Sequence, residues 1–346
     1  MRALSFSDAV NEALAQEMER DPTVIVYGIG VPDHKKVFGT TRGLLERFGP
    51  ARCFDTPLCE DAMTGFGLGA AINGLRPIHV HIRVDFLLLA MNQLVNMISC
   101  YAYETGGKVK VPIVIRAIVG RGLGQGSQHS KSLHSYFSHI PGLKVVIPTT
   151  PRDAKGLMIA AIRDNNPVIY IEHRWLHWAV NDVPEEPFEI PIGTGQRLHT
   201  GADVTVVGTS WMNVEALKAA EILARHGVGL DVIDPRTIAP FDDSLVIQSV
   251  MKTGRCIVAD NDWVDSGFSA EVAARVSEKC FGKLKAPVQR MGFAHTPCPT
   301  VRCLENEFYP SSIKMIRLVE QLLDLSPLDL SGEDFYSHER HFKGPF

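Results

Sequence analysis

Glu60 and Asp61 are two adjacent acids whose position could support proton chemistry. Pro57 ends an extended stretch before them, and the small residues that follow, such as Gly65 and Gly67, let a helix pack very close to a neighbour. A carboxylate held in such a tight setting can move a proton during catalysis. Acids also favour the first helical turn because they interact with the helix dipole, so local chemistry leaves a catalytic and a structural role open for Glu60.

A glycine-rich loop at 120–126 precedes a second candidate, His129. Its glycine spacing does not match Gly-x-Gly-x-x-Gly and no Walker lysine follows, so the loop does not predict a nucleotide site. A turn that presents His129 fits better, because an imidazole can give or take a proton near neutral pH. His134 and His139 are equally suitable on chemistry alone, and the residue types do not decide among the three.

His79 and His81 alternate on one face of an expected strand and could be metal ligands. A catalytic zinc site needs three protein ligands, and no third ligand is evident. Such a pair is more often made of surface or interface residues, and we leave His79 and His81 unassigned. The seven cysteines include no Cys-x-x-Cys pair. They are typical of small core residues rather than of a zinc or disulfide framework.

The composition limits the classes of partner. The chain has 346 residues, with 35 basic and 39 acidic side chains and a net charge of −4. No long basic run is present, so neither nucleic acid nor an anionic membrane is an expected partner, and the substrate should be small. The N-terminus has no apolar signal core and no apolar run is long enough to span a membrane, which favours a cytoplasmic protein.

Nearly continuous apolar strands alternate with amphipathic stretches along the whole chain. This pattern predicts an α/β protein with two parallel-sheet domains, each sheet covered by helices on both faces. We expect a first domain at 1–185, a linker at 186–200, a second domain at 201–326 and a C-terminal extension at 327–346. The expected strands lie at 23–27, 77–82, 111–118, 144–147, 168–172, 204–207, 230–233, 256–259 and 288–291.

Short motifs distributed over nearly the whole chain resemble one family, the β subunits of the thiamine diphosphate-dependent, decarboxylating component of 2-oxo acid dehydrogenase complexes. That family acts on pyruvate, branched-chain 2-oxo acids or acetoin. The motifs occur in the family's order and include Thr56-Pro57-Leu58-Cys59-Glu60, Gly74-Leu75-Arg76-Pro77, Asp85-Phe86, Gln128-His129-Ser130, Asp153-Ala154-Lys155-Gly156-Leu157, Asp234-Pro235-Arg236-Thr237-Ile238 and Thr296-Pro297-Cys298-Pro299.

The resemblance implies a pyrimidine-binding domain followed by a transketolase-type C-terminal domain. It implies that Glu60 bonds to a ring nitrogen of the cofactor's aminopyrimidine and so activates the thiamine diphosphate, and that Phe86 stacks on this ring. An ordinary core phenylalanine is the alternative for Phe86. His129 matches the histidine that assists proton transfer and acyl transfer to a lipoyl group, and this match alone selects it over the other two histidines.

The resemblance also implies metals and partner chains. In similar proteins, main-chain oxygens hold a structural potassium ion at the positions of Ile113, Ala161, Asp164 and Asn166. Magnesium and the diphosphate need a Gly-Asp-Gly motif, which this chain lacks. In the family that motif lies on a separate α subunit, so we expect half of an active site, an α2β2 assembly and a small 2-oxo acid substrate. A lipoyl acyltransferase could be a further partner.

Three departures from the family pattern affect this assignment. Gly28-Ile29-Gly30 replaces an acidic motif that the family uses for communication between its two active sites. Val80 and Ile82-Arg83 also differ from the family. Arg83 could bind a substrate carboxylate through two parallel hydrogen bonds, or it could pair with Asp85 or with an acid of a partner chain.

The third departure is an aromatic C-terminal tail, Ser326 to Phe346, which could block docking of the acyltransferase, clasp the α chain or be disordered. Two other functions stay open on sequence grounds. One is a stand-alone carboligase that makes acyloins without a lipoyl partner. The other is a noncatalytic structural subunit.

Overall fold

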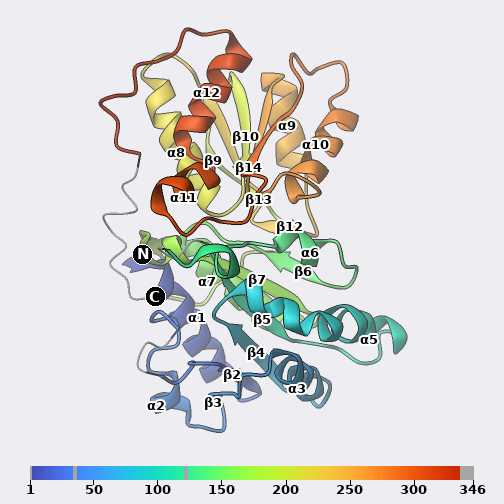
Figure 1. Cartoon of the computed structure of the whole chain (residues 1–346). Coiled ribbons are helices and arrows are strands. Elements are labelled where there is room, and N and C mark those ends of the chain that lie inside the picture. The colour runs from blue at the N-terminus through green and yellow to red at the C-terminus, as the bar shows by residue number, and fades with distance from the viewer. Residues whose placement is uncertain (1, 34–36, 121–123, 336–346) are drawn as a thin grey trace. The chain divides into compact units, whose positions relative to one another are not determined.

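The computed structural model describes residues 2–33, 37–120 and 124–335. Its contacts divide the chain into two compact units, shown in Figure 1, and each is described by itself. The first unit contains residues 1–121, 131–192 and 237–240, and the second contains 122–130, 193–236 and 241–346. The loop at 124–130 therefore belongs with the C-terminal half of the chain. The segment at 237–240 belongs with the N-terminal half.

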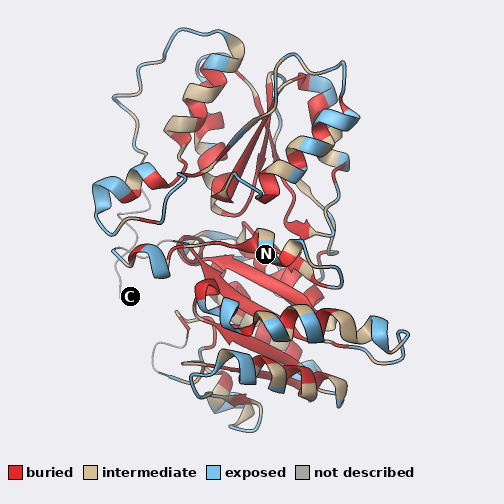
Figure 2. Cartoon of the chain, turned by 45° about the vertical axis from the view of Figure 1, so that its right-hand side comes forward, coloured by how far each residue is buried: buried red, intermediate tan, exposed pale blue. Residues whose placement is uncertain are grey.

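A seven-stranded sheet forms the centre of the first unit, in the order β12-β6-β7-β5-β4-β2-β3. Its strands run parallel except β12, which pairs antiparallel with β6 at one edge. The bounds are β2 Val24–Gly28, β3 Cys53–Phe54, β4 Arg76–His81, β5 Val114–Val119, β6 Lys144–Val146, β7 Val168–His173 and β12 Thr237–Ala239. β2, β5 and β7 are buried along their whole length, as expected of strands covered on both faces (Figure 2).

Helices cover both faces of this sheet. α1 (Phe6–Arg20) packs against α7 (Pro151–Arg163) on one face. Right-handed crossovers place α3 (Glu60–Ile72) and α5 (Ser99–Glu104) on the other face. The remaining elements of the unit are β1 Arg2–Ser5, α2 Leu44–Phe48, α4 Val84–Leu87, η1 Leu88–Ala90, η2 Gln93–Ile98, α6 His134–Ser138, η4 Arg174–Trp178 and β8 Val180–Val183.

Local sequence signals explain where the two long helices begin. Ser5 accepts a hydrogen bond from the backbone N–H of Asp8 and caps α1. Thr150 and Asp153 form a reciprocal capping box at α7, with Pro151 as its first residue. These caps satisfy backbone donors that the helices cannot satisfy themselves, and they define the starting points of both helices.

The second unit has a five-stranded sheet in the order β14-β13-β10-β11-β9, parallel except for β9. α8 and α12 pack on each other, and their buried residues form a core with the sheet. The bounds are η3 Gly126–Gln128, β9 Gln196–His199, β10 Val204–Gly208, α8 Trp211–Ala224, β11 Leu230–Asp234, α9 Ser244–Thr253, β13 Cys256–Trp263, α10 Phe268–Lys279, β14 Gln289–Phe293, α11 Arg302–Phe308 and α12 Ser312–Leu323.

All nine expected strands form, with bounds shifted by at most a few residues. Each sheet is mixed rather than fully parallel, because one short antiparallel strand is added at an edge. β9 lies inside the segment expected to be a linker and pairs with β11. The domain boundaries at 185 and 201 stay predictions.

The described part of the C-terminal extension packs on the second unit. Leu328, Leu330 and Phe335 contact its core, and Glu333 pairs with Arg225. The aromatic residues of the tail at 336, 342 and 346 lie outside the described residues. No single helix in the described chain has both the length and the apolar composition to span a membrane; one bent pair, Val84–Ala90 with Gln93–Glu104, meets those criteria jointly.

Candidate active site

Glu60 is the first residue of α3, after the loop that follows β3. Because β3 runs parallel to β2, this loop leaves the carboxyl edge of the sheet. The Glu60 side chain is partly exposed, and none of the described residues donates a hydrogen bond to its carboxylate. Its neighbour Asp61 accepts a hydrogen bond from Gln93 Nε2 at 3.2 Å. Of the two acids, Glu60 is thus the one available to bind a ligand.

The close packing expected for α3 occurs at Gly67. A Cβ there would lie 2.3 Å from Tyr27 Oη and 2.7 Å from Ile113 Cδ1, so only glycine fits. The Tyr27 hydroxyl in turn donates to the Met63 carbonyl at 3.0 Å. No atom lies within 4 Å of a Cβ placed on Gly69. The middle of the helix is therefore packed tightly against Tyr27 and Ile113.

Phe86 lies on α4, just beyond the carboxyl end of β4. The residue is 38% exposed, whereas the neighbouring Arg83 and Asp85 are buried. Phe86 is therefore not an ordinary core phenylalanine within this chain. An exposed aromatic face beside buried charges is suited to stacking on a planar ligand.

Arg83 donates to the Gly120 carbonyl at 2.7 Å, through Nη1. Asp85 pairs with Lys131 at 3.0 Å. Burial raises the pKa of Asp85, and Lys131 opposes this shift, with a smaller contribution from the Arg83 charge. The salt bridge of Asp85 is made with Lys131, while Arg83 is directed to the end of β5.

Arg174 is a candidate that the sequence analysis missed. It follows β7 directly and is buried, with its guanidinium 4.3 Å from the centre of the Phe38 ring. Burial and the nearby charge of Arg83 lower the pKa of Arg174 to about 10. The available signal was its position immediately after a buried strand, which resembles that of Arg83 after β4.

Another buried arginine of the first sheet is Arg116. Arg116 on β5 pairs with Glu172 on β7 at 2.5 Å, and both are fully buried. Burial alone would raise the pKa of Glu172, but the Arg116 charge and His177 hold it at about 2. This ion pair joins the central strands β5 and β7, two residues before Arg174 in the chain, and so has a structural role.

His79 and His81, which the sequence left unassigned, are both buried in the first unit, so the more common surface placement does not apply to them. His81 Nε2 and His79 Nδ1 are 3.2 Å apart, and the His79 ring stacks on Tyr27. Thr64, on α3, also bonds to His79. No group of three or more metal-ligating side chains is found among the described residues. Alternation on one face of β4 is confirmed, but the two rings fill a polar part of the core.

His129 follows η3 and belongs to the second unit. Its loop packs on the C-terminal half of the chain, since the Tyr309 hydroxyl donates to the Ser130 carbonyl at 3.2 Å and Thr300 packs against Gly126. The glycine-rich loop includes residues 121–123, which lie outside the described residues. Of the candidates, Glu60, Phe86 and Arg83 share the carboxyl edge of the first sheet, whereas His129 is held by the other unit.

Comparison with known proteins shows two family matches along the chain. Residues 2–177 match the transketolase pyrimidine binding domain and residues 193–315 match the transketolase C-terminal domain. Among solved structures, a split gene transketolase described as an inactive β4 tetramer gives a TM-score of 0.74 over 94% of this chain and 99% of that chain. At 22% sequence identity, this likeness shows the fold.

Curated relatives are much more similar in sequence. The β subunit of acetoin:2,6-dichlorophenolindophenol oxidoreductase from Cupriavidus necator is 41% identical, over 91% of this chain and 96% of the relative. The pyruvate dehydrogenase E1 β subunit of Rickettsia bellii is 40% identical, over 92% and 98%. The 2-oxoisovalerate dehydrogenase β subunit of Bacillus subtilis is 37% identical, over 94% and 100%. The chain belongs to the family of 2-oxo acid dehydrogenase E1 β subunits.

Membership in the E1 β family implies dependence on thiamine diphosphate and the presence of an α partner. Two features of the first unit fit that cofactor. Glu60 presents a carboxylate that no described side chain occupies, and Phe86 presents an exposed ring. These are the groups that an aminopyrimidine needs for a hydrogen bond and for stacking. The carboligase and structural-subunit alternatives gain no support from the E1 β relatives.

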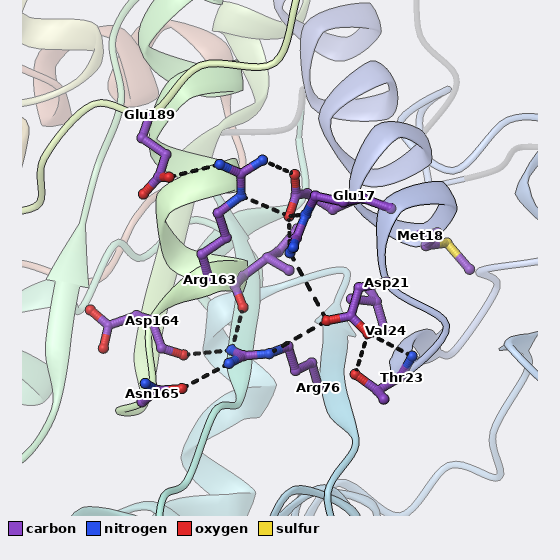
Figure 3. A network of polar contacts seen from close by, with 12 residues as sticks. Glu17, Met18, Asp21, Thr23, Val24, Arg76, Arg163, Asp164, Asn165 and Glu189 are labelled. Atoms are coloured by element: carbon purple, nitrogen blue, oxygen red, sulfur yellow. Dashed lines mark hydrogen bonds and ion pairs between the residues drawn. The ribbon is translucent and has the colours of Figure 1, made fainter.

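The potassium positions expected from the E1 β family lie at the amino edge of the first sheet. The Val111 N–H donates to the Asn165 carbonyl at 3.1 Å, which brings the segment around Ile113 next to the loop at 164–166. Arg76 donates to the Asp164 carbonyl at 2.9 Å (Figure 3). The Val168 N–H donates to the Ile113 carbonyl at 3.0 Å. The segments are therefore adjacent, and two of the four oxygens already accept a protein hydrogen bond.

Proposed function

We propose that this chain is the β subunit of a cytoplasmic, thiamine diphosphate-dependent 2-oxo acid dehydrogenase of the pyruvate or acetoin type. It would act with an α subunit in an α2β2 assembly, and a lipoyl acyltransferase would accept the acyl group. The observation that carries the proposal is the placement of Glu60 and Phe86 at one sheet edge, within a chain whose relatives are E1 β subunits.

The residues of this chain would prepare the cofactor for reaction. When bound, thiamine diphosphate supplies a nucleophilic carbon and accepts the electrons released by decarboxylation. Glu60 would share a proton with the ring nitrogen of the aminopyrimidine, and its place in the first helical turn suits a negative charge. Phe86 would stack on the same ring and fix its orientation.

His129 would hold and move a proton at its imidazole during acyl transfer. This role is supported by the Gln128-His129-Ser130 match and by the packing of that loop on the second unit. The α subunit would supply the magnesium ligands and the diphosphate motif, since this chain has no Gly-Asp-Gly. Neither chain alone would then be active.

A potassium ion is proposed at the main-chain oxygens of Ile113, Ala161, Asp164 and Asn166. The adjacency of these segments supports this site, and its role would be to hold the loop after α7 against β5. The Arg76 guanidinium, which already bonds to the Asp164 carbonyl, places a positive charge beside this site. We therefore assign the ion a structural role only.

The test is co-expression with the α subunit, followed by measurement of carbon dioxide release from 2-oxo acids with thiamine diphosphate, magnesium and an artificial electron acceptor. Glu60→Gln should lower turnover at least about a hundredfold, the usual scale for removing an acid–base group. Asp61→Asn is the matched control, because Asp61 bonds to Gln93 and should leave turnover nearly unchanged.

Three other results would change the assignment. Retained turnover in a well-assembled Glu60→Gln complex would remove the catalytic role of that residue. Acyloin formation with an aldehyde acceptor, without oxidation, would instead favour the carboligase. No binding of thiamine diphosphate by the assembled complex would indicate a structural subunit.

A further inference from the structure

The loop before His129 is rich in glycine, and this composition conflicts with the role proposed for the imidazole. Residues 120–126 include four glycines, each of which gives the backbone more conformational freedom than other residues have. A group that moves a proton during catalysis must be held within about 0.5 Å of its working position. Contacts with the rest of the second unit must therefore fix this loop.

One anchor lies at Gly126, three residues before His129. Its φ is +65°, and a Cβ there would lie 2.7 Å from Thr300 Oγ1, so the loop backbone packs directly on the segment that precedes α11. The His129 N–H donates to the Gly126 carbonyl at 3.4 Å and closes a short turn. The position of His129 therefore depends on the contact between Gly126 and Thr300.

A second anchor lies directly after His129. The Tyr309 hydroxyl donates to the Ser130 carbonyl at 3.2 Å, and Ser130 is fully buried. Burial raises the pKa of Tyr309 well above its usual value, so the hydroxyl keeps the proton that it donates. Tyr309 and Ser130 are 179 positions apart in the sequence. This hydrogen bond therefore attaches the loop to the tertiary structure of the second unit.

The Tyr309 ring belongs to a packed aromatic cluster. Its centre lies 5.1 Å from that of Phe293 and 4.9 Å from that of Phe308, both in edge-to-face arrangements. The Phe293 ring also contacts Trp263, whose Nε1 donates to the Ala294 carbonyl at 3.0 Å. Aromatic pairs have preferred geometries, and a buried ring in several such pairs has little freedom to move. The Tyr309 hydroxyl is thus a fixed point of attachment.

We propose that Tyr309 is a positioning residue for His129. Its hydroxyl, together with the contact at Gly126, holds the imidazole where acyl transfer needs it. This inference rests on the proposed dehydrogenase function and goes beyond it by naming the residue that fixes the acyl-transfer group. Glu60, which is proposed to activate the cofactor, belongs to the first unit. Loss of the Tyr309 hydroxyl should therefore slow acyl transfer and spare decarboxylation.

The test measures two reactions of the assembled α–β enzyme. One is decarboxylation of its best 2-oxo acid with an artificial electron acceptor, and the other is transfer of the acyl group to oxidised lipoamide. Tyr309→Phe removes one hydroxyl and keeps the ring in the cluster. We expect acyl transfer to fall about fivefold to tenfold in kcat, the effect of losing one buried hydrogen bond, and decarboxylation to change by less than about twofold.

A double-mutant cycle separates positioning from a general effect on structure. Because Tyr309 acts through His129, Tyr309→Phe should cause no further loss of acyl transfer in a His129→Gln background. Tyr170→Phe is the matched control. Tyr170 donates a buried hydroxyl to the Ala154 carbonyl at 3.0 Å in the first unit, and its replacement should leave the ratio of the two reactions unchanged.

Two glycine replacements test the other anchor. Gly126→Ala should lower acyl transfer by a factor similar to that of Tyr309→Phe, because the added Cβ displaces the loop from Thr300. Gly124→Ala is its control. The φ of Gly124 is +72°, so the backbone strain is similar, but a Cβ there would lie 3.9 Å from the nearest atoms of Thr300, an ordinary contact. Gly124→Ala should therefore have the smaller effect.

Four results would overturn the proposal. Equal losses in both reactions would assign Tyr309 a general structural role, and full acyl transfer in Tyr309→Phe would show that the hydroxyl is not needed. Independent, multiplying losses in the double variant would show that Tyr309 does not act through His129. Unchanged acyl transfer in His129→Gln would remove the group to be positioned. In each case decarboxylation still depends on Glu60, whereas failure of the proposed function would abolish decarboxylation or that dependence.

Discussion

The amino and carboxyl edges of the first sheet both contain arginines, but in opposite electrostatic settings. At the amino edge, the buried carboxylate of Glu17 accepts hydrogen bonds from Arg163 and Arg20, and Glu189 binds the other side of Arg163 (Figure 3). Arg76 donates to the carbonyls that end α7 and to the Asn165 side chain. The arginines at the amino edge contact carboxylates and the carbonyls of helix ends, and both kinds of group stabilise a positive charge.

At the carboxyl edge, two guanidiniums are held within each other's field. The pKa shifts record the difference, because hydrogen bonding to Glu17 raises the pKa of Arg163, whereas burial and Arg83 lower that of Arg174 to about 10. The amino edge is arranged for stability. Groups with strongly perturbed pKa values in a polar cluster are typical of functional sites, and the carboxyl edge has this character.

Replacing one arginine at each edge should give the largest difference in stability between the two edges. Arg163→Gln removes the hydrogen bonds to Glu17 and Glu189 and leaves the Glu17 carboxylate buried with Arg20 as its remaining cation. We expect a loss of about 4 kcal/mol in the local opening free energy of α1 and α7, the scale for breaking a buried ion pair. Arg174→Gln should cost less than about 2 kcal/mol, because it removes a repulsion together with its contacts.

Native-state hydrogen exchange measures both changes on the assembled enzyme. Backbone amides of α1 and α7 report the first variant, and amides at the ends of β5 and β7 report the second. If the two variants lost equal amounts of opening free energy, the electrostatic distinction between the two edges would be contradicted.

Acid should destabilise the carboxyl edge before the amino edge. Burial lowers the pKa of His81 to about 4 from its usual 6.5, and burial followed by the His81 charge lowers that of His79 well below its usual value. As pH falls from 6.5 to 4, an opened chain takes up the His81 proton and the folded chain does not. Stability that is complete above pH 6.5 is therefore lost over this window, by about 3 kcal/mol for His81.

The amino edge also loses stability as pH falls, but over a lower pH window. Hydrogen bonds and nearby cations outweigh burial and keep the pKa values of Asp21 and Asp164 below the usual 3.8, so their contribution is lost only as pH falls through those lowered values. The measurement is Tm against pH from 7 to 3 for the wild type, His81→Gln and Asp21→Asn. His81→Gln should flatten the curve between pH 6.5 and 4. A wild-type Tm that is constant over that range would contradict the expectation.

The smallest effect should come from replacing Gly120, the residue that directly follows β5. Gly120→Ala would place a Cβ 2.6 Å from the His173 ring at a φ of +96°. We expect a cost of about 2 kcal/mol from strain and overpacking, with displacement of the carbonyl that holds Arg83. Gly43→Ala is the control, because its φ is +77° and nothing lies within 4 Å, so only the cost of backbone strain, about 1 kcal/mol, should remain. The measurement is the shift in Tm of both variants, together with KM for the preferred substrate. If Gly120→Ala and Gly43→Ala change these quantities equally, the His173 contact does not position Arg83.

The sequence by itself determined the strands and the family. Continuous apolar runs can be buried only between covering layers, so their positions predicted all nine of the expected strands. Short edge strands such as β9 and β12 carry no such signal, because pairing at an edge depends on where the chain passes rather than on local pattern. Glu60 and Phe86 were likewise recognisable from motifs, and the structure places both just beyond strand ends, while the roles proposed for them stay predictions.

Only the tertiary structure decided how charged and polar side chains combine. Arg83 and Arg174 lie far apart in the sequence, and the charge of one affects the other because β4, β5 and β7 are neighbours in the sheet. For the same reason, the sequence could not show that Asp85 pairs with Lys131, or that His79 and His81 are enclosed by Tyr27 and Thr64. Hydrophobic burial follows local pattern, whereas the energy of a charge depends on its distance to every other charge and on its exclusion from water, and both are set by the fold.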